Sequence, residues 1–370
     1  MGVQRGHALS ILRVLALPKY GCLGASSRLR ILQYLPWLGA GGLEVTVQSL
    51  LDDAQLQRRY AHGHYDKPAL LLAYAKRVKS MLNRRNFDLV WIEKEALQWW
   101  PLWAELALLR GVPYVLDYDD AVFHHYDMHR LAVVRKLYGR RLDGLMAKAT
   151  LVVAGNQYLA QRARDAGAAW VEELPTVIDL ERYPKACVAK ASLADGLPRV
   201  VWIGSPSTVH YLQQIAEPLQ ALAARRPFVL RVIGGGAIDL PGVQVEVLAW
   251  TEATEVASIQ AADVGVMPLK DTPWEQGKCG YKLIQYMACG LPVVGSAVGA
   301  NHDIVVHGTT GFLANTPQDW LAGLETLLTD AALRQHMGRA CRARVEDFYC
   351  IQQTGPRMVD LLKKAASRNQ

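Results

Sequence analysis

The stretch GKCGYKLIQYMACGLPVVGS, residues 277–296, contains a loop, a helix, a helix end and a strand. Residues 281–289 have apolar side chains on one helical face, and Gly290 followed by Pro292 is typical of a helix C-terminus. The β-branched residues that come next predict a buried strand. A helix directly before a buried strand is the repeating unit of a parallel sheet, so the stretch predicts an α/β fold.

Outside this stretch, short apolar runs rich in β-branched residues alternate with longer helical patterns along most of the chain. Such alternation predicts parallel sheets with helices on both faces. The runs predicted as strands are residues 12–18, 43–50, 87–93, 113–118 and 150–156, then 199–205, 228–235, 243–250, 262–269, 291–296 and 311–314. The helical patterns of the first half are residues 26–39, 68–85, 99–110 and 128–148.

The alternation pauses at residues 173–184, where two prolines interrupt it. We therefore predict two Rossmann-like domains that face each other across a cleft. The first is expected at residues 1–183, the second at residues 184–345, and a helical segment at residues 346–370 is expected to return to the first. Ligands of open parallel sheets bind beyond the carboxyl ends of the strands, so the loops there are the candidate sites.

The composition is that of a folded globular protein, with 51% hydrophobic and 20% charged residues among 370. No apolar run approaches the roughly 18–20 residues that cross a bilayer. The net charge is +7, and residues 1–183 carry most of it, with 24 lysines and arginines against 18 acidic residues. Basic clusters at residues 75–85 and 129–148 are either solvated helix faces or a surface attracted to anionic lipid or to a pyrophosphate-linked acceptor. No nucleic-acid recognition motif accompanies the charge, so nucleic acid is not an expected partner.

Six cysteines are scattered along the chain without a C-x-x-C pair. This spacing argues against a zinc site and against a disulfide framework, and it favours a reducing compartment. We therefore expect a cytoplasmic protein, with any membrane contact at the inner face of the plasma membrane. Trp99, Trp100 and Trp103 lie close together and form either part of the core or an aromatic patch that faces lipid.

Three polar side chains near the start of the helix at residues 281–289 suggest a ligand. Lys278 and Lys282 lie close to the helix N-terminus, whose N–H groups and partial positive charge favour anions. Together they suit a diphosphate, and Gln285, one turn into the helix, suits hydroxyls such as those of a ribose. The alternative is that both lysines face solvent and that the glutamine is incidental.

Residues 283–294, LIQYMACGLPVV, resemble the donor-site signature of the family 4 retaining glycosyltransferases, whose fold is called GT-B. Residues 299–314 are similar to the next segment of that family, and residues 174–184, 200–212 and 262–282 are similar to further segments in the expected order. The resemblance implies a hexosyltransferase-type enzyme that moves a sugar, with retention, from a nucleotide-diphosphate sugar to a saccharide or lipid-linked saccharide in cell-surface polysaccharide or glycan synthesis. The alternatives are a GT-B sugar-nucleotide epimerase and a non-catalytic polysaccharide-assembly protein.

The chain departs from the family signature, which has a glutamate, seven residues and a second glutamate. Gln285 stands at the second glutamate position and Gly277 at the first, with Glu275 two residues earlier. Glutamine can still bind ribose hydroxyls, so the resemblance continues to imply a nucleotide site. The residues expected to bind the donor are Gly204, Ser205, Ser207, Glu275, Lys278, Lys282 and Gln285.

The loop DYDDAVFHH, residues 117–125, offers Asp119, Asp120 and His124 as catalytic groups or as contacts to sugar hydroxyls. The alternatives are an aspartate that caps the next helix and a histidine on the surface. The resemblance implies a metal-independent enzyme without a cofactor, in which cations and helix-end N–H groups stabilise the leaving diphosphate. Asp117 and Asp119 have the spacing of a metal motif, but they lie in the half where the acceptor is expected.

The loop GASSRLR, residues 24–30, is a candidate for binding a phosphate or the acceptor. Its backbone N–H groups precede a predicted helix, where Ser26 would otherwise act as the cap. Either arginine would suit an acidic acceptor. The residues expected in this role are Gly24, Ser26, Arg28 and Arg30.

Overall fold

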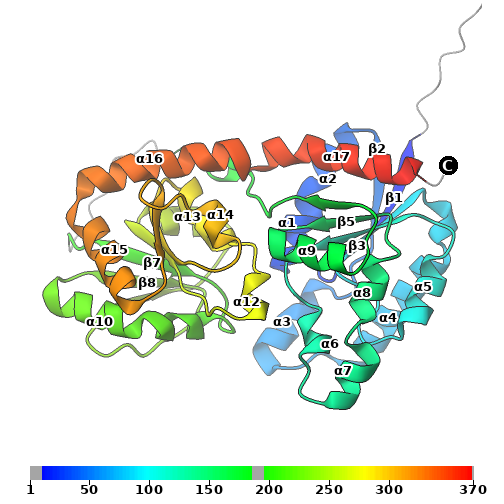
Figure 1. Ribbon diagram of the computed structural model, residues 1–370, viewed down its shortest axis with the longest axis horizontal. Helices are drawn as coiled ribbons and strands as arrows, with labels where there is room; N and C mark the ends of the chain where they lie inside the picture. Colours follow the sequence, from blue (N-terminus) through cyan, green and yellow to red (C-terminus); the bar gives the residue numbers. More distant parts are fainter. Residues whose placement is uncertain (1–10, 186–195, 369–370) are drawn as a thin grey trace, which may run out of the picture. The chain divides into compact units, whose positions relative to one another are not determined.

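The structure, a computed structural model, describes residues 11–185 and 196–368. The chain divides into two compact units, each with one six-stranded sheet (Figure 1). Unit 1 comprises the chain up to Gly155, Leu159–Leu174 and the chain from Gly355 onward, and unit 2 comprises Asn156–Tyr158 and Pro175–Thr354.

All strand pairs of unit 1 are parallel, in the order β2-β1-β3-β4-β5-β6. The strands are β1 (Leu12–Leu17), β2 (Leu43–Val47), β3 (Leu89–Glu93), β4 (Tyr114–Tyr118), β5 (Leu151–Ala154) and β6 (Val171–Glu173). The helices are α1 (Ala25–Arg30), η1 (Leu32–Tyr34), α2 (Leu35–Ala40), α3 (Asp53–His62), α4 (Lys67–Leu82), η2 (Arg84–Asn86), α5 (Leu102–Leu109), α6 (His124–Asp127), α7 (Ala132–Tyr138), α8 (Arg141–Met146), α9 (Gln157–Asp165) and α17 (Ile351–Ser367).

The sheet of unit 2 is also parallel, in the order β12-β11-β10-β7-β8-β9. Its strands are β7 (Arg199–Ile203), β8 (Val229–Ile233), β9 (Gln244–Leu248), β10 (Val264–Met267), β11 (Val293–Ser296) and β12 (Gly311–Ala314). Its helices are η3 (Leu180–Arg182), η4 (Val209–Ile215), α10 (Ala216–Arg225), α11 (Glu255–Gln260), α12 (Pro273–Gln276), α13 (Tyr281–Ala288), α14 (Asn301–Ile304), α15 (Pro317–Thr329) and α16 (Ala331–Phe348). The predicted α/β fold with two parallel sheets is confirmed.

The central strands of both sheets are buried on both faces. Strands β3, β4, β7 and β8 are buried along their whole length, which explains why most of their residues are apolar. The edge strand β6 was not predicted, because its three residues are only partly buried and give no apolar run. The helical pattern at residues 128–148 forms two helices, α7 and α8, instead of one.

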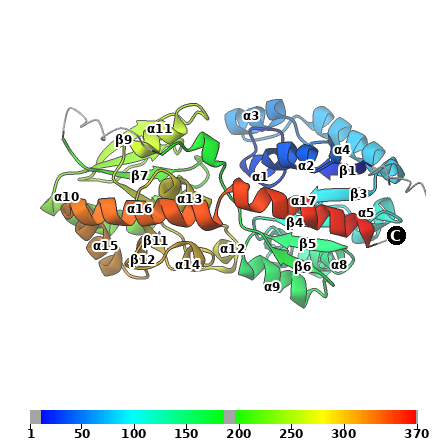
Figure 2. The same cartoon turned by 90° about the horizontal axis from the view of Figure 1, so that it is seen from above.

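The last helix, α17, joins unit 1 over most of its length. It lies over unit 1 in both Figure 1 and Figure 2. Gly355 packs so closely on Trp37 that a Cβ would be 2.5 Å from the indole, and Arg357 forms an ion pair with Glu172 at 2.8 Å. The chain therefore completes the first unit with residues that come after the second, and this return begins at Gly355, later than the residue 346 that the sequence suggested.

Tyr286 fixes α13 against the sheet of unit 2. Its hydroxyl accepts a hydrogen bond from the backbone N–H of Ile203 at 2.9 Å. Its ring lies against Gly265 in β10, where a Cβ would be 2.3 Å from the ring, so only glycine permits this packing. Since α13 follows β10 through a loop at the carboxyl edge of the sheet, its N-terminus lies at the edge where ligands of such sheets bind.

Within the described residues, the structure contains no helix with the length and apolar character needed to span a bilayer. The described cysteines are all free thiols, and Cys187 lies outside the described residues. Burial raises the pKa of Cys289 and of Cys341, so these thiols stay protonated at neutral pH, as core residues do.

Candidate functional site

A glycine with a left-handed backbone conformation forms the turn that leads into α13. Gly280, the residue before the helix, has φ 63°, a conformation that favours glycine. A Cβ at this position would also lie 2.2 Å from Cδ1 of Ile304. The turn thus brings the first N–H groups of an eight-residue helix to the carboxyl edge of the unit 2 sheet.

The two lysines predicted to bind a diphosphate each lie over an indole ring. The Lys282 ammonium is 5.5 Å from the ring centroid of Trp202, and the Lys278 ammonium is 5.7 Å from that of Trp274. An aromatic face attracts a cation at this distance without neutralising its charge. Both lysines therefore bring positive charge to the start of α13.

The indole of Trp202 also organises the glycine loops that follow β7 and β8. A Cβ at Gly204 would be 2.5 Å from this ring, and a Cβ at Gly235 would be 2.7 Å from it. Both loops and Lys282 therefore converge on one buried side chain. In the first loop, the hydroxyls of Ser205 and Ser207 lie 2.8 Å apart and are hydrogen-bonded to each other. The structure thus brings Gly204, Ser205, Ser207 and Lys282 to one edge, and donor binding by these residues remains a prediction.

Gln285 lies in a buried network instead of on the surface. Its amide nitrogen donates to the hydroxyl of Tyr183 at 3.0 Å, and that hydroxyl lies 3.1 Å from a carboxylate oxygen of Glu255. Burial raises the pKa of Tyr183 well above its usual value, so the hydroxyl stays protonated and donates to Glu255. The indole N–H of Trp250 donates to the same carboxylate at 2.8 Å. Gln285 therefore has a structural partner, and ribose binding by its side chain remains a prediction.

Glu275, the alternative to the missing first glutamate, is buried in α12. Its carboxylate accepts a hydrogen bond from the Tyr211 hydroxyl at 2.6 Å and another from the Thr272 hydroxyl. These bonds hold the carboxylate between α12 and η4. A contact between Glu275 and a sugar remains a prediction, and it would compete with both hydroxyl donors.

Arg30 corrects one prediction for unit 1. It was expected to meet an acidic acceptor, but its side chain is fully buried and its Nε donates to Asp117 Oδ1 at 2.7 Å. A second nitrogen of the guanidinium donates to the carbonyl oxygen of Leu174 at 2.8 Å. Burial raises the pKa of Asp117 to about 6, although Arg30 acts in the opposite direction. Arg30 therefore forms a buried ion pair and a buried hydrogen bond in the interior of unit 1.

Asp119 lies beside a lysine that the sequence reasoning missed. Lys94 follows β3 with φ 62°, an uncommon conformation for a lysine, and its ammonium is 2.8 Å from Asp119 Oδ1. The same ammonium donates to the hydroxyl of Ser26 at 3.2 Å and lies 3.7 Å from Glu93. Burial alone would raise the pKa of Asp119, but Lys94 more than offsets it, so this pKa lies below its usual value. Asp119 is therefore a carboxylate at neutral pH, suited to accept hydrogen bonds and not to donate a proton.

Comparison with known proteins connects both units to one family. A model described as "Glycosyltransferase Family 4" matches residues 30–182, and one described as "Glycosyl transferases group 1" matches residues 197–330. The chain belongs to the family 4-like glycosyltransferases. Their GT-B fold agrees with solved structures: sucrose-phosphate synthase from Thermosynechococcus elongatus has a TM-score of 0.72 at 17% identity, over 95% of this chain and 98% of that one.

Two further relatives bear on this glycosyltransferase. The Anabaena protein HepE, solved in complex with UDP and glucose, has a TM-score of 0.69 at 17% identity and covers 95% of this chain and 100% of its own. A D-inositol 3-phosphate glycosyltransferase from Pseudarthrobacter chlorophenolicus is 32% identical over 131 residues. That alignment spans 35% of this chain and only 30% of the relative, so it reports similarity over less than a third of that protein.

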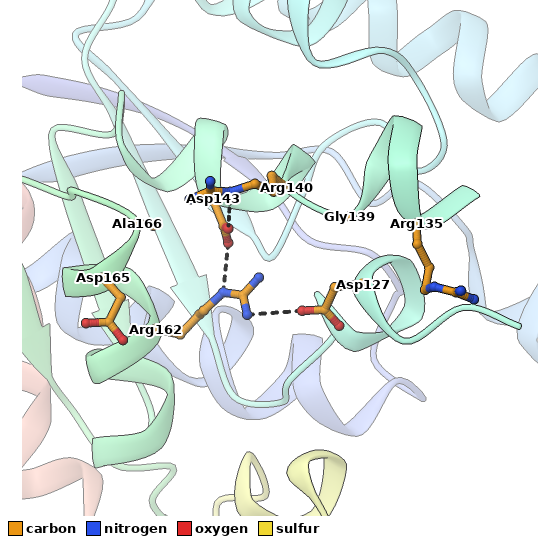
Figure 3. Close-up of a pocket in the computed structure, with 8 residues that line it drawn as sticks. All are labelled: Asp127, Arg135, Gly139, Arg140, Asp143, Arg162, Asp165 and Ala166. Carbon is orange, nitrogen blue, oxygen red and sulfur yellow. Dashed lines mark hydrogen bonds and ion pairs between the residues drawn. The ribbon is translucent and has the colours of Figure 1, made fainter. Parts of the chain in front are cut away.

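In this glycosyltransferase, Asp120 and His124 both contact residues that are close to them in the sequence. Asp120 Oδ1 accepts a hydrogen bond from the adjacent Ala121 N–H at 3.1 Å, but the residue that precedes α6 is Phe123 and no side chain among the described residues caps that helix, so Asp120 is not the capping aspartate considered as an alternative. Nδ1 of His124 lies 2.7 Å from Asp127 Oδ1, and the histidine side chain is only 8% exposed, so it is not a surface histidine. Figure 3 shows the guanidinium of Arg162 lying between Asp127 and Asp143, at 3.0 Å and 2.8 Å.

Asp127 and Arg162 also line an open hollow of about 440 Å³ in unit 1 (Figure 3). The residues around it are Asp127, Arg135, Gly139, Arg140, Asp143, Arg162, Asp165 and Ala166. Three arginines and three aspartates meet there, so the hollow has no dominant charge. The catalytic roles predicted for Asp119, Asp120 and His124 remain predictions.

The glycine loop after β1 is held by its own residues. A Cβ at Gly24 would be 2.3 Å from Cβ of Tyr20, so this close turn requires glycine. The guanidinium of Arg28 donates to the carbonyl oxygen of Cys22 at 2.8 Å. Gly24, and not Ser26, is the residue that precedes α1, so the alternative in which Ser26 caps this helix is wrong. Phosphate or acceptor binding by this loop remains a prediction.

Over residues 11–185 and 196–368, no three histidine, cysteine, aspartate or glutamate side chains gather in a way that would hold a metal ion. The two aspartates with metal-motif spacing each face a cation: Asp117 pairs with Arg30, and Asp119 pairs with Lys94. A divalent ion at either carboxylate would lie close to a side-chain cation that repels it. The residues present therefore do not fit a metal at this loop.

Proposed function

We propose that this glycosyltransferase moves a sugar from a nucleotide-diphosphate sugar to a saccharide or a lipid-linked saccharide, with retention, during synthesis of a cell-surface polysaccharide or glycan. The observation that carries the proposal is the α13 N-terminus, where Gly280 aims the helix and Lys278 and Lys282 add positive charge. Support for the nucleotide comes from HepE, which was solved with UDP.

The chemistry proposed for this edge is stabilisation of a leaving diphosphate. As the bond to the sugar breaks, negative charge grows on the departing phosphate oxygens. Helix-end N–H groups and the Lys278 and Lys282 ammonium groups are already in place for that charge. Since these groups are fixed by the fold before the reaction, they would stabilise the transition state without rearranging.

A panel of nucleotide diphosphates tests the donor proposal. We expect UDP or GDP to raise the unfolding temperature, because a ligand that binds only the folded state stabilises it by mass action. Hydrolysis of the matching nucleotide sugar should follow, which would separate an enzyme from a non-catalytic assembly protein. If no nucleotide diphosphate shifts the unfolding temperature at millimolar concentration, the donor proposal is wrong.

We also propose that unit 1 attaches to an anionic membrane at the inner face of the plasma membrane through α7. This helix buries none of its residues: Val133 is 59% exposed and Leu137 is 70% exposed. Leu131, just before it, is 50% exposed, while Arg135 and Lys136 add positive charge to the same turns. Apolar and basic side chains on one exposed helix are the combination that binds an anionic lipid surface.

Sedimentation with vesicles tests the attachment. We expect the protein to pellet with anionic vesicles at low salt and to bind neutral vesicles much less, because each basic residue contributes about 1 kcal/mol near an anionic leaflet and salt screens it. Leu137→Glu should weaken pelleting, while Phe348→Glu, at a residue 58% exposed in unit 2, should not. Equal and negligible binding to both vesicles would leave a soluble acceptor and would not affect the donor proposal.

A further inference from the structure

Two lysines at the carboxyl edge of unit 1 have opposite surroundings. The Lys94 ammonium faces Asp119 at 2.8 Å and donates to the Ser26 hydroxyl. Within the described residues, no hydrogen bond or ion pair reaches the Lys19 ammonium, which lies directly beyond the end of β1. Its contact is the face of the Tyr20 ring, 5.2 Å from the centroid. Lys94 is therefore engaged within the fold, whereas the charge of Lys19 is not neutralised.

Glu93, a carboxylate whose charge raises the pKa of Lys19, already has other partners. Glu93 Oε2 accepts the backbone N–H of Lys19 at 2.9 Å and the Ser27 hydroxyl at 2.5 Å. Its other oxygen lies 3.7 Å from the Lys94 ammonium. Burial, and after it the charge of Lys94, lower the pKa of Lys19, so its surroundings disfavour an uncompensated cation.

Two phenol hydroxyls lie near this cation. The hydroxyls of Tyr20 and Tyr65 are 3.0 Å apart, and burial raises the pKa of Tyr65 to about 12 and also raises that of Tyr20. Both stay protonated at neutral pH, and since one hydroxyl donates to the other, the pair has one O–H left for a ligand. Lys19 and Tyr65 are close enough that each affects the pKa of the other. His125 is also within electrostatic reach, and its own pKa is lowered by burial and then by Lys19.

We propose that Lys19, together with the hydroxyls of Tyr20 and Tyr65, binds an anionic group carried by the acceptor. The cation supplies charge and the phenol pair supplies a donor, which is the combination that recognises a phosphate or a sugar carboxylate. The other charged groups that face Lys19 are Lys94, Glu93 and Glu95, and the Lys94 charge adds to the attraction for an anion. The inference rests on the proposed function, in which unit 1 holds the acceptor.

Calorimetric titration of the full chain with inorganic phosphate, and separately with glucuronate, tests this site. We expect at least one anion to bind, and the tighter of the two identifies the source of the charge. Lys19→Met should weaken that binding at least tenfold, while Lys19→Arg should preserve it. Lys79→Met, which removes an exposed lysine of the same unit, is the matched control and should bind like the wild type. Equal binding by Lys19→Met and the wild type, or no binding by the wild type, would overturn the proposal.

A labelling experiment on the wild type keeps the test independent of how the variants fold. Acetylation by acetic anhydride, read by mass spectrometry, should slow at Lys19 and not at Lys79 when the bound anion is present. Unchanged labelling at Lys19 would contradict the inference. Stabilisation by UDP, measured alongside, separates the two proposals: if UDP binds and no anion protects Lys19, only the acceptor inference fails.

Discussion

The cationic side chains at the carboxyl edges of the two sheets contact different kinds of group. In unit 1, Arg30 lies against Asp117 and Lys94 lies against Asp119. In unit 2, Lys278 and Lys282 lie over the indoles of Trp274 and Trp202. A carboxylate carries a negative charge that neutralises a cation, whereas an aromatic face attracts a cation but carries no net charge. The comparison indicates that several charged residues at the unit 1 edge stabilise the fold, whereas for the lysines at the unit 2 edge we propose a role in binding the donor diphosphate.

Breaking an internal pair of unit 1 should have the largest effect. Arg30→Met leaves Asp117 buried beside an orphaned carbonyl oxygen, so we expect the free energy of unfolding to fall by about 3–5 kcal/mol. Urea denaturation measures this change. Arg28→Met removes a half-buried arginine whose guanidinium donates to the carbonyl oxygen of Cys22, and we expect a loss of about 1 kcal/mol. Similar losses in both variants would mean that the Arg30–Asp117 pair does not stabilise the interior.

The pH dependence of stability tests whether the charged pair of Arg30 and Asp117 is buried in the interior of unit 1. Burial raises the pKa of Asp117 from 3.8 to about 6, so the folded state binds more protons than the unfolded state between these values. The free energy of unfolding should therefore fall as the pH rises from about 4 to about 6, by roughly 2–3 kcal/mol from this group. Asp117→Asn cannot ionise and should lose less stability over that range. Urea denaturation of both proteins at several pH values measures it, and a pH-independent difference between them would show that the carboxyl is not shifted.

The same contrast explains what the sequence could predict. The α13 region follows from local rules: a glycine before the helix, lysines at its start, and glycine and proline at its end. The central strands of both sheets were also predictable, because strands that are buried on both faces are mostly apolar. Edge strand β6 was missed because it is short and only partly buried.

The partners of charged residues in unit 1 were not predictable, since they join segments far apart in the sequence. Arg30 and Asp117 both looked like candidates for ligand binding, yet they pair with each other in the core. Lys94 was missed because its position beside Asp119 depends on the β3–β4 order and on a left-handed backbone. A lysine directly after a fully buried strand was the available signal.

Removing a lysine at the unit 2 edge should have an intermediate effect that appears in binding and not in folding. Lys282→Ala should weaken the binding of the nucleotide diphosphate by about 1–3 kcal/mol, the scale of a lost charge-assisted hydrogen bond. Lys278→Ala should act similarly, and Lys270→Ala, at an exposed lysine of the same unit, should bind like the wild type. Calorimetry measures the affinities. Unchanged affinity in both variants would return these lysines to the role of solvated surface residues.

Removing divalent metal should have the smallest effect. We expect donor hydrolysis and transfer to survive EDTA, because the proposed diphosphate site already has two lysines and a helix N-terminus. The aspartates of residues 117–120 give little opportunity for a metal, since Arg30 and Lys94 lie against two of them. The measurement is the rate in EDTA, compared with the rate after addition of magnesium or manganese. A complete loss that either metal restores would mean that a divalent ion displaces one of these cations, and the comparison between the two edges would then have to be reversed.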